Sequence, residues 1–434
     1  MDGNKILADL KKLSEIENIK DVKQLTSALF PGTHCPLMGA ALVARGIKDS
    51  MVLLVGTDEC AYYTKKMTIG SKDFGGLTGR CASVIVDSKD ITFGSSEKIT
   101  AAFHELIAEK KPSCVFLVST CVIEIIGDDI DSIAYSLWDE TSIPVLPVHT
   151  EHFKCVNHIP GIERTISVCS ELMKKEECDG SVNILGQRSG DFRSTEVYKI
   201  LNAEDVKIGM MLPCGCDVEE IKNAAKAKVN IVVNSTALKL AKTMKRKFDI
   251  PYVEFQRFAD PEKIYIAYKL LFEKLDKALP KSIEEKYANT CAFVQERKSK
   301  LENVKFIYGN TPFIPFELVS YMSKLDMQAM LMQISTYTSE DQEYANTIGE
   351  KYNPYVTKSA NIAPLQYVYD VLKPDLYLGH EFPARLMKKG IAIVHTDRAS
   401  SMLGFEVTEF LIQAFVKAAA QSKQYKENIK NGIM

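Results

Sequence analysis

The stretch CVFLVSTCVIEIIGDDIDSIAYSLW, residues 114–138, decides the fold class of this 434-residue chain. Residues 114–119 form a continuous apolar run closed by a serine, which is typical of a parallel strand buried on both faces. A helix is predicted over residues 127–138, where Asp128 and Asp129 lie in the first turn and favour the helix dipole. A strand followed directly by a helix is the first half of a βαβ unit. Cys121 lies between the two, so the chain places a thiol at a strand-to-helix turn.

The same alternation of short apolar runs and helical patterns repeats three times along the chain. The second series of strands begins at VNILG, residues 182–186, and the third begins at VKFIYG, residues 304–309. Such alternation predicts an α/β protein with parallel sheets. A charged, helix-prone connector is expected between the second and third series. The expected units are residues 1–180, residues 181–276, the connector 277–303, and residues 304–434 with a long C-terminal helix.

The composition argues against a nucleic-acid-binding, membrane-spanning or disulfide-rich protein. The net charge of −2 argues against a nucleic-acid partner or an anionic membrane surface. The longest apolar runs, such as MVLLV at residues 51–55, are too short to span a bilayer, and the first residues lack the apolar stretch of a signal peptide. A cytoplasmic location is therefore expected. Eleven cysteines, an odd number, argue against a disulfide framework and leave metal ligands or buried thiols.

Several reactive side chains follow predicted strands directly. In open parallel sheets, ligands bind outside the carboxyl ends of the strands, so these positions are candidates for a site. The residues concerned are Cys60, Cys121, Cys214, Cys216, His380 and His395.

Three cysteines stand in distinctive settings: Cys35 in GTHCPLMGA, Cys60 in GTDECAYY and Cys121 in STCVIEIIGDD. Their wide separation along the chain is unlike the close spacing of a zinc finger or a small ferredoxin. Thiolates brought together by the fold could hold an iron–sulfur cluster. Spacing alone favours the alternative of three unrelated cysteines.

The residues around these cysteines carry more information than their spacing. The quoted motifs occur in one order along nearly the whole chain: CPLMGA (35–40), DSMVLLVGTDECAYY (49–63), DITFGSSEKI (90–99), STCVIEIIGDDI (119–130), IPVLPVHTEHF (143–153), LAKTMKRKFDIPYVEF (240–255), KPDLYLGHEF (373–382) and LGFEV (403–407). In these motifs the chain resembles component 1 of the nitrogenase-like oxidoreductases. That family includes the nitrogenase molybdenum–iron protein, its cofactor-assembly scaffold and the dark-operative protochlorophyllide reductases.

The resemblance implies three Rossmann-like domains around a central cleft. It implies that Cys35, Cys60 and Cys121 are the ligands of an iron–sulfur cluster, of the 4Fe–4S type or a related one, near a subunit boundary. It further implies a homodimer or a heterodimer with a related subunit. Electrons would arrive from a separate ATP-hydrolysing iron–sulfur reductase protein. The absence of a G-x-x-x-x-G-K-[ST] motif in this chain agrees with that division of labour.

The chain departs from the family pattern at several positions. Asp58 and Glu59 stand before Cys60, where a glycine is usual just before that cysteine, and could tune a cluster, supply an oxygen ligand or only begin the following helix. Val233 or Asn234 stands where the molybdenum–iron cofactor's cysteine would fall, and Leu403 where its histidine would fall. The standard molybdenum–iron cofactor is therefore not expected.

Two further groups are weaker candidates for the cleft. Cys214 and Cys216 flank a glycine before a helix, where a thiolate with a lowered pKa could bind metal, although the turn could also exist because Asp217 caps that helix. His380 and His395 end strands of the third unit, but a lone histidine is more often structural.

The sequence leaves three candidate functions for the protein. The leading one is an oxidoreductase component that relays electrons through the cluster to an unidentified substrate in the cleft. The second is a non-catalytic scaffold for metallocofactor assembly, and the third is a cluster-free α/β binding protein.

Overall fold

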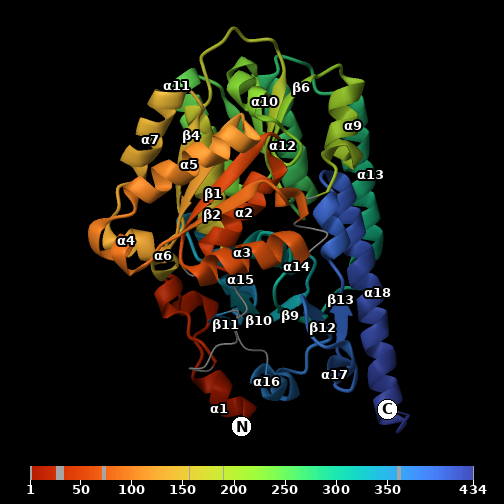
Figure 1. The fold of residues 1–434 in the computed structure, drawn as a ribbon. Helices are drawn as coiled ribbons and strands as arrows, with labels where there is room; N and C mark the ends of the chain where they lie inside the picture. Colours follow the sequence, from red (N-terminus) through yellow and green to blue (C-terminus); the bar gives the residue numbers. More distant parts are fainter. Residues whose placement is uncertain are drawn as a thin grey trace.

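The computed structural model describes residues 2–25, 34–70, 75–155, 157–188, 190–358 and 363–433. These residues form three parallel β-sheets with helices packed around them, as Figure 1 shows. The α/β prediction is therefore confirmed. Among the described helices, none combines the length and the apolar character that crossing a bilayer requires.

The first sheet has the strand order β2-β1-β3-β4. Its strands are β1 (Ser50–Gly56), β2 (Cys81–Ile85), β3 (Cys114–Ser119) and β4 (Val145–His149). The helices of this part are α2 (Pro36–Gly46), α3 (Asp58–Gly70), α4 (Ser88–Phe93), α5 (Ser96–Lys110), α6 (Cys121–Ile126), α7 (Ile130–Thr141) and α8 (Ile159–Val168).

The second sheet has the strand order β6-β5-β7-β8. Its strands are β5 (Val182–Gln187), β6 (Ile208–Pro213), β7 (Val229–Val232) and β8 (Tyr252–Glu254). Its helices are α9 (Glu196–Ala203), α10 (Val218–Lys222), α11 (Leu238–Phe248) and α12 (Pro261–Lys274). The first two sheets share one apolar core, in which Leu54 and Phe116 pack in the same cluster as Leu185 and Leu212.

The third sheet has the strand order β11-β10-β9-β12-β13. Its strands are β9 (Lys305–Tyr308), β10 (Gln328–Ile334), β11 (Tyr355–Lys358), β12 (Leu376–Leu378) and β13 (Ala392–Val394). Its helices are α14 (Pro315–Lys324), α15 (Gln342–Lys351), α16 (Leu365–Leu372), α17 (Pro383–Met387) and the long α18 (Phe405–Lys430). Helix α13 (Lys281–Lys298), within the expected connector, packs along α18 (Figure 1).

The N-terminal residues lie in an unexpected place. They were predicted to belong with residues 1–180, but helix α1 (Gly3–Ala8) packs on α16 of the third part. Leu7 and Leu10 are buried in the same cluster as Ile307 and Leu331. The reason is that their apolar side chains complete the outer face of the third sheet, which sequence position alone does not reveal.

The turn after β3 also differs from its prediction. The helix expected over residues 127–138 corresponds to α7, which begins at Ile130. A short helix that the sequence did not predict, α6, precedes it: it begins at Cys121 and is capped by Gly127, which has a left-handed φ of 80°. A glycine at this position ends a helix at little steric cost. Asp129 then caps α7 by accepting a hydrogen bond from the Ser132 N–H, which confirms its expected role at a helix start.

Candidate metal centre

The three cysteines that the sequence singled out lie at one edge of the first sheet. Strands β1 and β3 pair in parallel register, with Val55 opposite Ser119, so their carboxyl ends meet. Cys60 is the third residue of α3, which follows β1, and Cys121 is the first residue of α6, which follows β3. Cys35 precedes α2 as its N-cap residue. All three thiols are partly buried and none forms a disulfide.

Side-chain contacts connect the Cys35 segment to the Cys60 helix. The Nδ1 atom of His34 lies 2.6 Å from the hydroxyl of Tyr63, which is one turn after Cys60 on α3. Burial raises the pKa of the Cys35 thiol, although the backbone N–H groups of Met38 and Leu37 act in the opposite direction. Cys35 and Cys60 also pack against the same apolar cluster.

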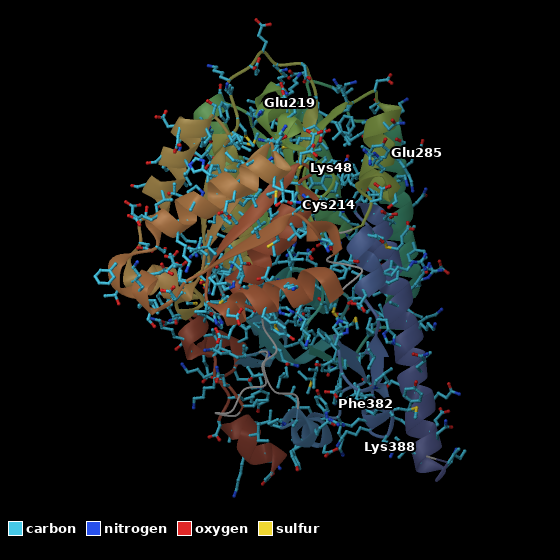
Figure 2. All side chains as sticks on the ribbon, in the orientation of Figure 1. Lys48, Cys214, Glu219, Glu285, Phe382 and Lys388 are labelled. Atoms are coloured by element: carbon cyan, nitrogen blue, oxygen red, sulfur yellow. The ribbon has the colours of Figure 1, made fainter. Side chains whose placement is uncertain are left out.

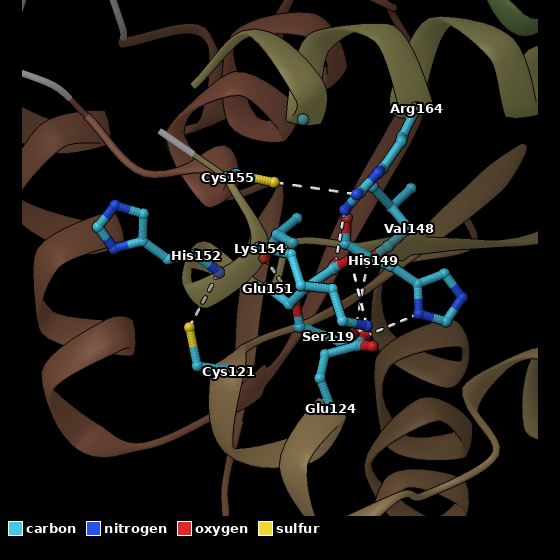
Figure 3. Close-up of polar contacts among 12 residues, drawn as sticks. Ser119, Cys121, Glu124, Val148, His149, Glu151, His152, Lys154, Cys155 and Arg164 are labelled. Carbon is cyan, nitrogen blue, oxygen red and sulfur yellow. Dashed lines mark hydrogen bonds and ion pairs between the residues drawn. The ribbon is translucent and has the colours of Figure 1, made fainter. Parts of the chain in front are cut away.

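Cys121 has a hydrogen-bond donor directed at its sulfur. The backbone N–H of His152 donates to Cys121 Sγ over 3.2 Å, as Figure 3 shows. His152 begins the one-turn helix η4 (His152–Lys154) that follows β4. The guanidinium of Arg164 holds this loop by donating to the His149 carbonyl at 2.7 Å and to the buried carboxylate of Glu151 at 2.6 Å.

The described residues contain no site for a single metal ion. Among the described residues, no group of three or more histidine, cysteine, aspartate or glutamate side chains is placed to hold one metal ion. A single zinc ion needs every thiolate at about 2.3 Å from one point. In an iron–sulfur cluster each thiolate binds a different iron, so the ligands stand farther apart.

Asp58 and Glu59 lie at the start of α3 and are exposed. The pKa of Glu59 is lowered chiefly by a hydrogen bond with the Thr57 side chain. Carboxylates in the first turn of a helix are favoured by its dipole. Their positions therefore fit the interpretation that these residues begin the helix, and none of the described hydrogen bonds joins them to a cysteine.

Cys214 and Cys216 lie in a structural turn. Cys216 is fully buried, its thiol donates to the Pro213 carbonyl, and burial raises its pKa far above the usual value. None of the described contacts joins Cys214 or Cys216 to the three cysteines, and a metal-binding role for either stays a prediction. Asp217 caps α10 through the Glu220 N–H, and the Lys48 N–H donates to the Cys216 carbonyl at 2.8 Å. Figure 2 shows Lys48 and Cys214 side by side, where this turn joins the end of α2.

His380 and His395 follow β12 and β13 of the third sheet, and both are exposed. His380 Nε2 lies 3.4 Å from Asp397 Oδ1. None of the described contacts joins either histidine to the three cysteines. Their place in a central cleft stays a prediction.

Sequence reasoning missed a polar network beside Cys121. The Glu124 carboxylate bonds to the Ser119 hydroxyl and lies 2.7 Å from His149 Nδ1, while His149 Nε2 lies 3.2 Å from Asp131. The hydrogen bond with Glu124 is the main cause that raises the pKa of His149 to about 9. The available signal was the position of His149 at the end of a predicted strand, the same rule that selected the cysteines.

Comparison with known proteins agrees with this geometry. The sequence model of the nitrogenase component 1 type oxidoreductases matches residues 35–419. The chain is 28% identical to the nitrogenase iron–molybdenum cofactor biosynthesis protein NifE of Clostridium pasteurianum, over 72% of this chain and 71% of that one. It is 25% identical to the NifE protein of Methanococcus maripaludis, over 88% and 82% of the two chains.

The relationship extends to a solved nitrogenase structure, Nitrogenase Cp1 at pH 6.5. That structure superimposes with a TM-score of 0.74 over 92% of this chain and 94% of the other, at 16% sequence identity. Identity this low supports the fold alone. Together with the match over residues 35–419, it shows that the chain belongs to the nitrogenase component 1 type oxidoreductase family.

Proposed function

We propose that this protein is a scaffold subunit in the assembly of a nitrogenase-type metallocofactor, and that it holds an iron–sulfur cluster through Cys35, Cys60 and Cys121. The observation that supports the proposal is the position of three partly buried thiols. Cys60 and Cys121 lie in the helices that follow the paired strands β1 and β3, Cys35 precedes α2, and Cys121 Sγ accepts the His152 N–H. The bound cluster would supply electron storage. The chain's own residues hold the thiolates and limit their contact with water.

Two observations favour a scaffold over a substrate-reducing enzyme. The first is that the two relatives described above are both named as cofactor biosynthesis proteins. The second concerns the positions where the sequence expects the ligands of the molybdenum–iron cofactor. Val233 and Leu403 are both buried in the apolar cluster around the second sheet, and Asn234 caps the short helix η8 (Ser235–Ala237). Side chains packed in an apolar core are not available to a metal.

A partner subunit is part of the proposal. Large apolar side chains near the cysteines are exposed: Tyr62 by 64%, Ile125 by 71% and Phe153 by 55%. Apolar residues exposed around a charged site favour coverage by another chain. We expect a dimer with a second copy or a related subunit. All eleven cysteines are free, which suits the reducing cytoplasm, where we expect the protein to act.

The first test is the content of iron and acid-labile sulfide in anaerobically purified protein. The wild type should be brown and contain both, whereas Cys121→Ser should lose most of the cluster because a hydroxyl is a poorer iron ligand than a thiolate. Cys178→Ser is the matched control, since Cys178 is exposed and far along the chain from the site. A colourless wild type that takes up no cluster from added iron and sulfide would refute the proposal.

A second measurement separates the scaffold from the enzyme. A scaffold should bind and release an additional metallocluster, which iron and molybdenum analysis of the protein before and after incubation with an acceptor would reveal. The second candidate function, electron relay to a substrate, predicts turnover when an ATP-dependent iron–sulfur reductase protein is supplied. ATP would then be needed only by that partner. Turnover without release of an extra cluster would favour the enzyme.

A further inference from the structure

The loop that leads from the end of β4 through η4, residues 149–155, is held by one side chain of helix α8, Arg164. Its Nη1 atom donates to the His149 carbonyl at 2.7 Å and to the Glu151 carboxylate at 2.6 Å, while its Nη2 atom lies 3.9 Å from Cys155 Sγ. Figure 3 shows these three contacts around one guanidinium. Because the guanidinium is planar and carries five N–H donors, it can bind several acceptors in a fixed arrangement.

The Glu151 carboxylate makes this arginine necessary. The Glu151 side chain is only 7% exposed, so its charge is shielded from water and needs a cationic partner. Arg164 supplies that partner at 2.6 Å, whereas the Lys154 ammonium lies 3.8 Å from the other carboxylate oxygen and belongs to a side chain that is 61% exposed. Removal of the guanidinium would therefore leave a buried carboxylate without a close cation, and the loop would have to open to water.

The same loop brings a hydrogen-bond donor to the candidate cluster site. The backbone N–H of His152, the residue after Glu151, donates to Cys121 Sγ at 3.2 Å. Thr150, the residue before Glu151, donates its hydroxyl to the Ser119 carbonyl at 2.5 Å and ties the loop to the end of β3. The direction of the His152 N–H thus depends on the backbone at residue 151, whose side chain the arginine holds.

A hydrogen bond to a sulfur that binds iron stabilises the more negative, reduced form of an iron–sulfur cluster, so it raises the reduction potential. We propose that Arg164 is a positioning residue that sets the reduction potential of the cluster held through Cys121, because it fixes the His152 N–H on the Cys121 sulfur. This inference rests on the proposed function, since it requires that a cluster is bound. The arginine itself transfers neither a proton nor an electron, and acts only through the loop.

The first part of the test measures the loop in cluster-free protein, by hydrogen exchange of the peptide that covers residues 149–155. Arg164→Met should raise the exchange rate of this peptide at least about tenfold, because the loop loses its anchor and opens more often. Arg164→Lys keeps the charge on a shorter side chain without the planar fork, and should give an intermediate rate. Arg193→Met is the control, since that side chain is 60% exposed, and it should leave the rate unchanged.

The second part measures the midpoint potential of the cluster after reconstitution with ferrous iron and sulfide, by a redox titration followed by EPR. Arg164→Met should lower the potential, and Arg164→Lys should lower it less. Glu151→Met separates anchoring from charge. If the arginine acted only through its positive charge, removal of the nearby negative charge would raise the potential. Since Glu151→Met also releases the loop, we expect it to lower the potential instead.

Each outcome decides between the proposals. Unchanged exchange of the loop in the Arg164 variants would overturn the inference, and so would faster exchange with an unchanged potential, or a raised potential in Glu151→Met. These three results would leave the proposed function intact. If Arg164→Met does not fold, Arg164→Lys and Glu151→Met decide by the same two measurements. Failure of the wild type to take up any iron and sulfide would overturn both proposals.

Discussion

At the scale of single residues, the Cys121 sulfur lies close to an ion pair between Glu124 and His149. The His152 N–H points at the sulfur, and three residues further along α6 the Glu124 carboxylate meets His149. Ser119, at the end of β3, donates its hydroxyl to the same carboxylate. The strand end, the helix and the β4 terminus are thus joined by polar groups beside the candidate cluster. The Glu124 carboxylate, which is mostly buried, has two hydrogen-bond partners, as a buried polar group requires.

The Glu124–His149 pair predicts a pH-dependent contribution to stability. The folded pKa of His149 is about 9, above its ordinary value of 6.5, so the stabilisation is complete below about pH 6.5 and is lost as the pH rises through 9. Glu124→Gln should lower the free energy of unfolding by about 1 to 2 kcal/mol at pH 6, after allowance for solvent screening of the half-exposed imidazole. At pH 10 the difference should be small. Chemical denaturation at both pH values measures it.

The His104–Glu140 pair, whose side chains are both exposed, serves as the control for the Glu124–His149 pair. His104 Nε2 lies 3.4 Å from Glu140, whose side chain is 59% exposed, and Glu140→Gln should change stability by less than about 0.5 kcal/mol at either pH. If Glu124→Gln were equally destabilised at pH 6 and at pH 10, the His149 charge would not be the cause.

At the scale of elements, the crossing of α2 and α8 positions Cys35. Two glycines permit the contact: a Cβ at Gly39 would lie 2.1 Å from the His158 carbonyl oxygen, and one at Gly161 would lie 1.8 Å from the Pro36 carbonyl oxygen. Real Cβ atoms do not approach backbone so closely, and only glycine lets the two helices meet here. The start of α2, and Cys35 before it, is therefore held against the segment that contacts Cys121.

Gly161→Ala should disturb both the packing and the metal site. The added methyl group forces α8 away from Pro36, and we expect a loss of at least about 2 kcal/mol in the free energy of unfolding, with a lower iron content after reconstitution. Gly349→Ala is the matched control in helix α15, because its nearest neighbours would lie 4.0 Å away. That change should stabilise the protein by up to about 1 kcal/mol. Equal stability of Gly161→Ala and wild type would show that the helices can separate freely.

At the scale of the whole molecule, Arg257 joins the second sheet to the third. It follows β8 and donates to three backbone carbonyls of the third part: Ser400 at 2.7 Å, Met402 at 3.2 Å and Pro312 at 3.3 Å. Burial, with a smaller effect from Arg188, lowers the pKa of Arg257 to about 10, so it remains charged at neutral pH. One guanidinium therefore satisfies three carbonyls at the junction.

Replacing this arginine should loosen the junction. Arg257→Met leaves the three carbonyls without their donor, and we expect a loss of roughly 2 to 3 kcal/mol in the free energy of unfolding. Backbone amides near residues 312 and 400–402 should exchange their hydrogens faster, which mass spectrometry measures. Arg193→Met, at a side chain 60% exposed, should leave both readouts unchanged. Unaltered exchange in Arg257→Met would mean that other contacts hold the parts together.

The sequence by itself determined the α/β class and the position of Cys60 and Cys121 after strands, because both depend on short local patterns of apolar residues. Short continuous apolar runs such as residues 114–119 are typical of buried strands, and helical patterns between them indicate parallel sheets. A thiol directly after such a run must lie at the carboxyl edge of a sheet, so Cys60 and Cys121 could be placed without coordinates.

Only the tertiary structure decided the contacts between distant segments. It placed residues 2–25 on the third sheet, buried Cys216 in a turn and brought Glu124, His149 and Arg164 to the cysteine site. These outcomes depend on which surfaces meet after folding, through apolar burial and hydrogen bonds between residues far apart in the chain. A strand pattern specifies where a side chain leaves the sheet. The partner that it meets there is set by the packing of the whole molecule.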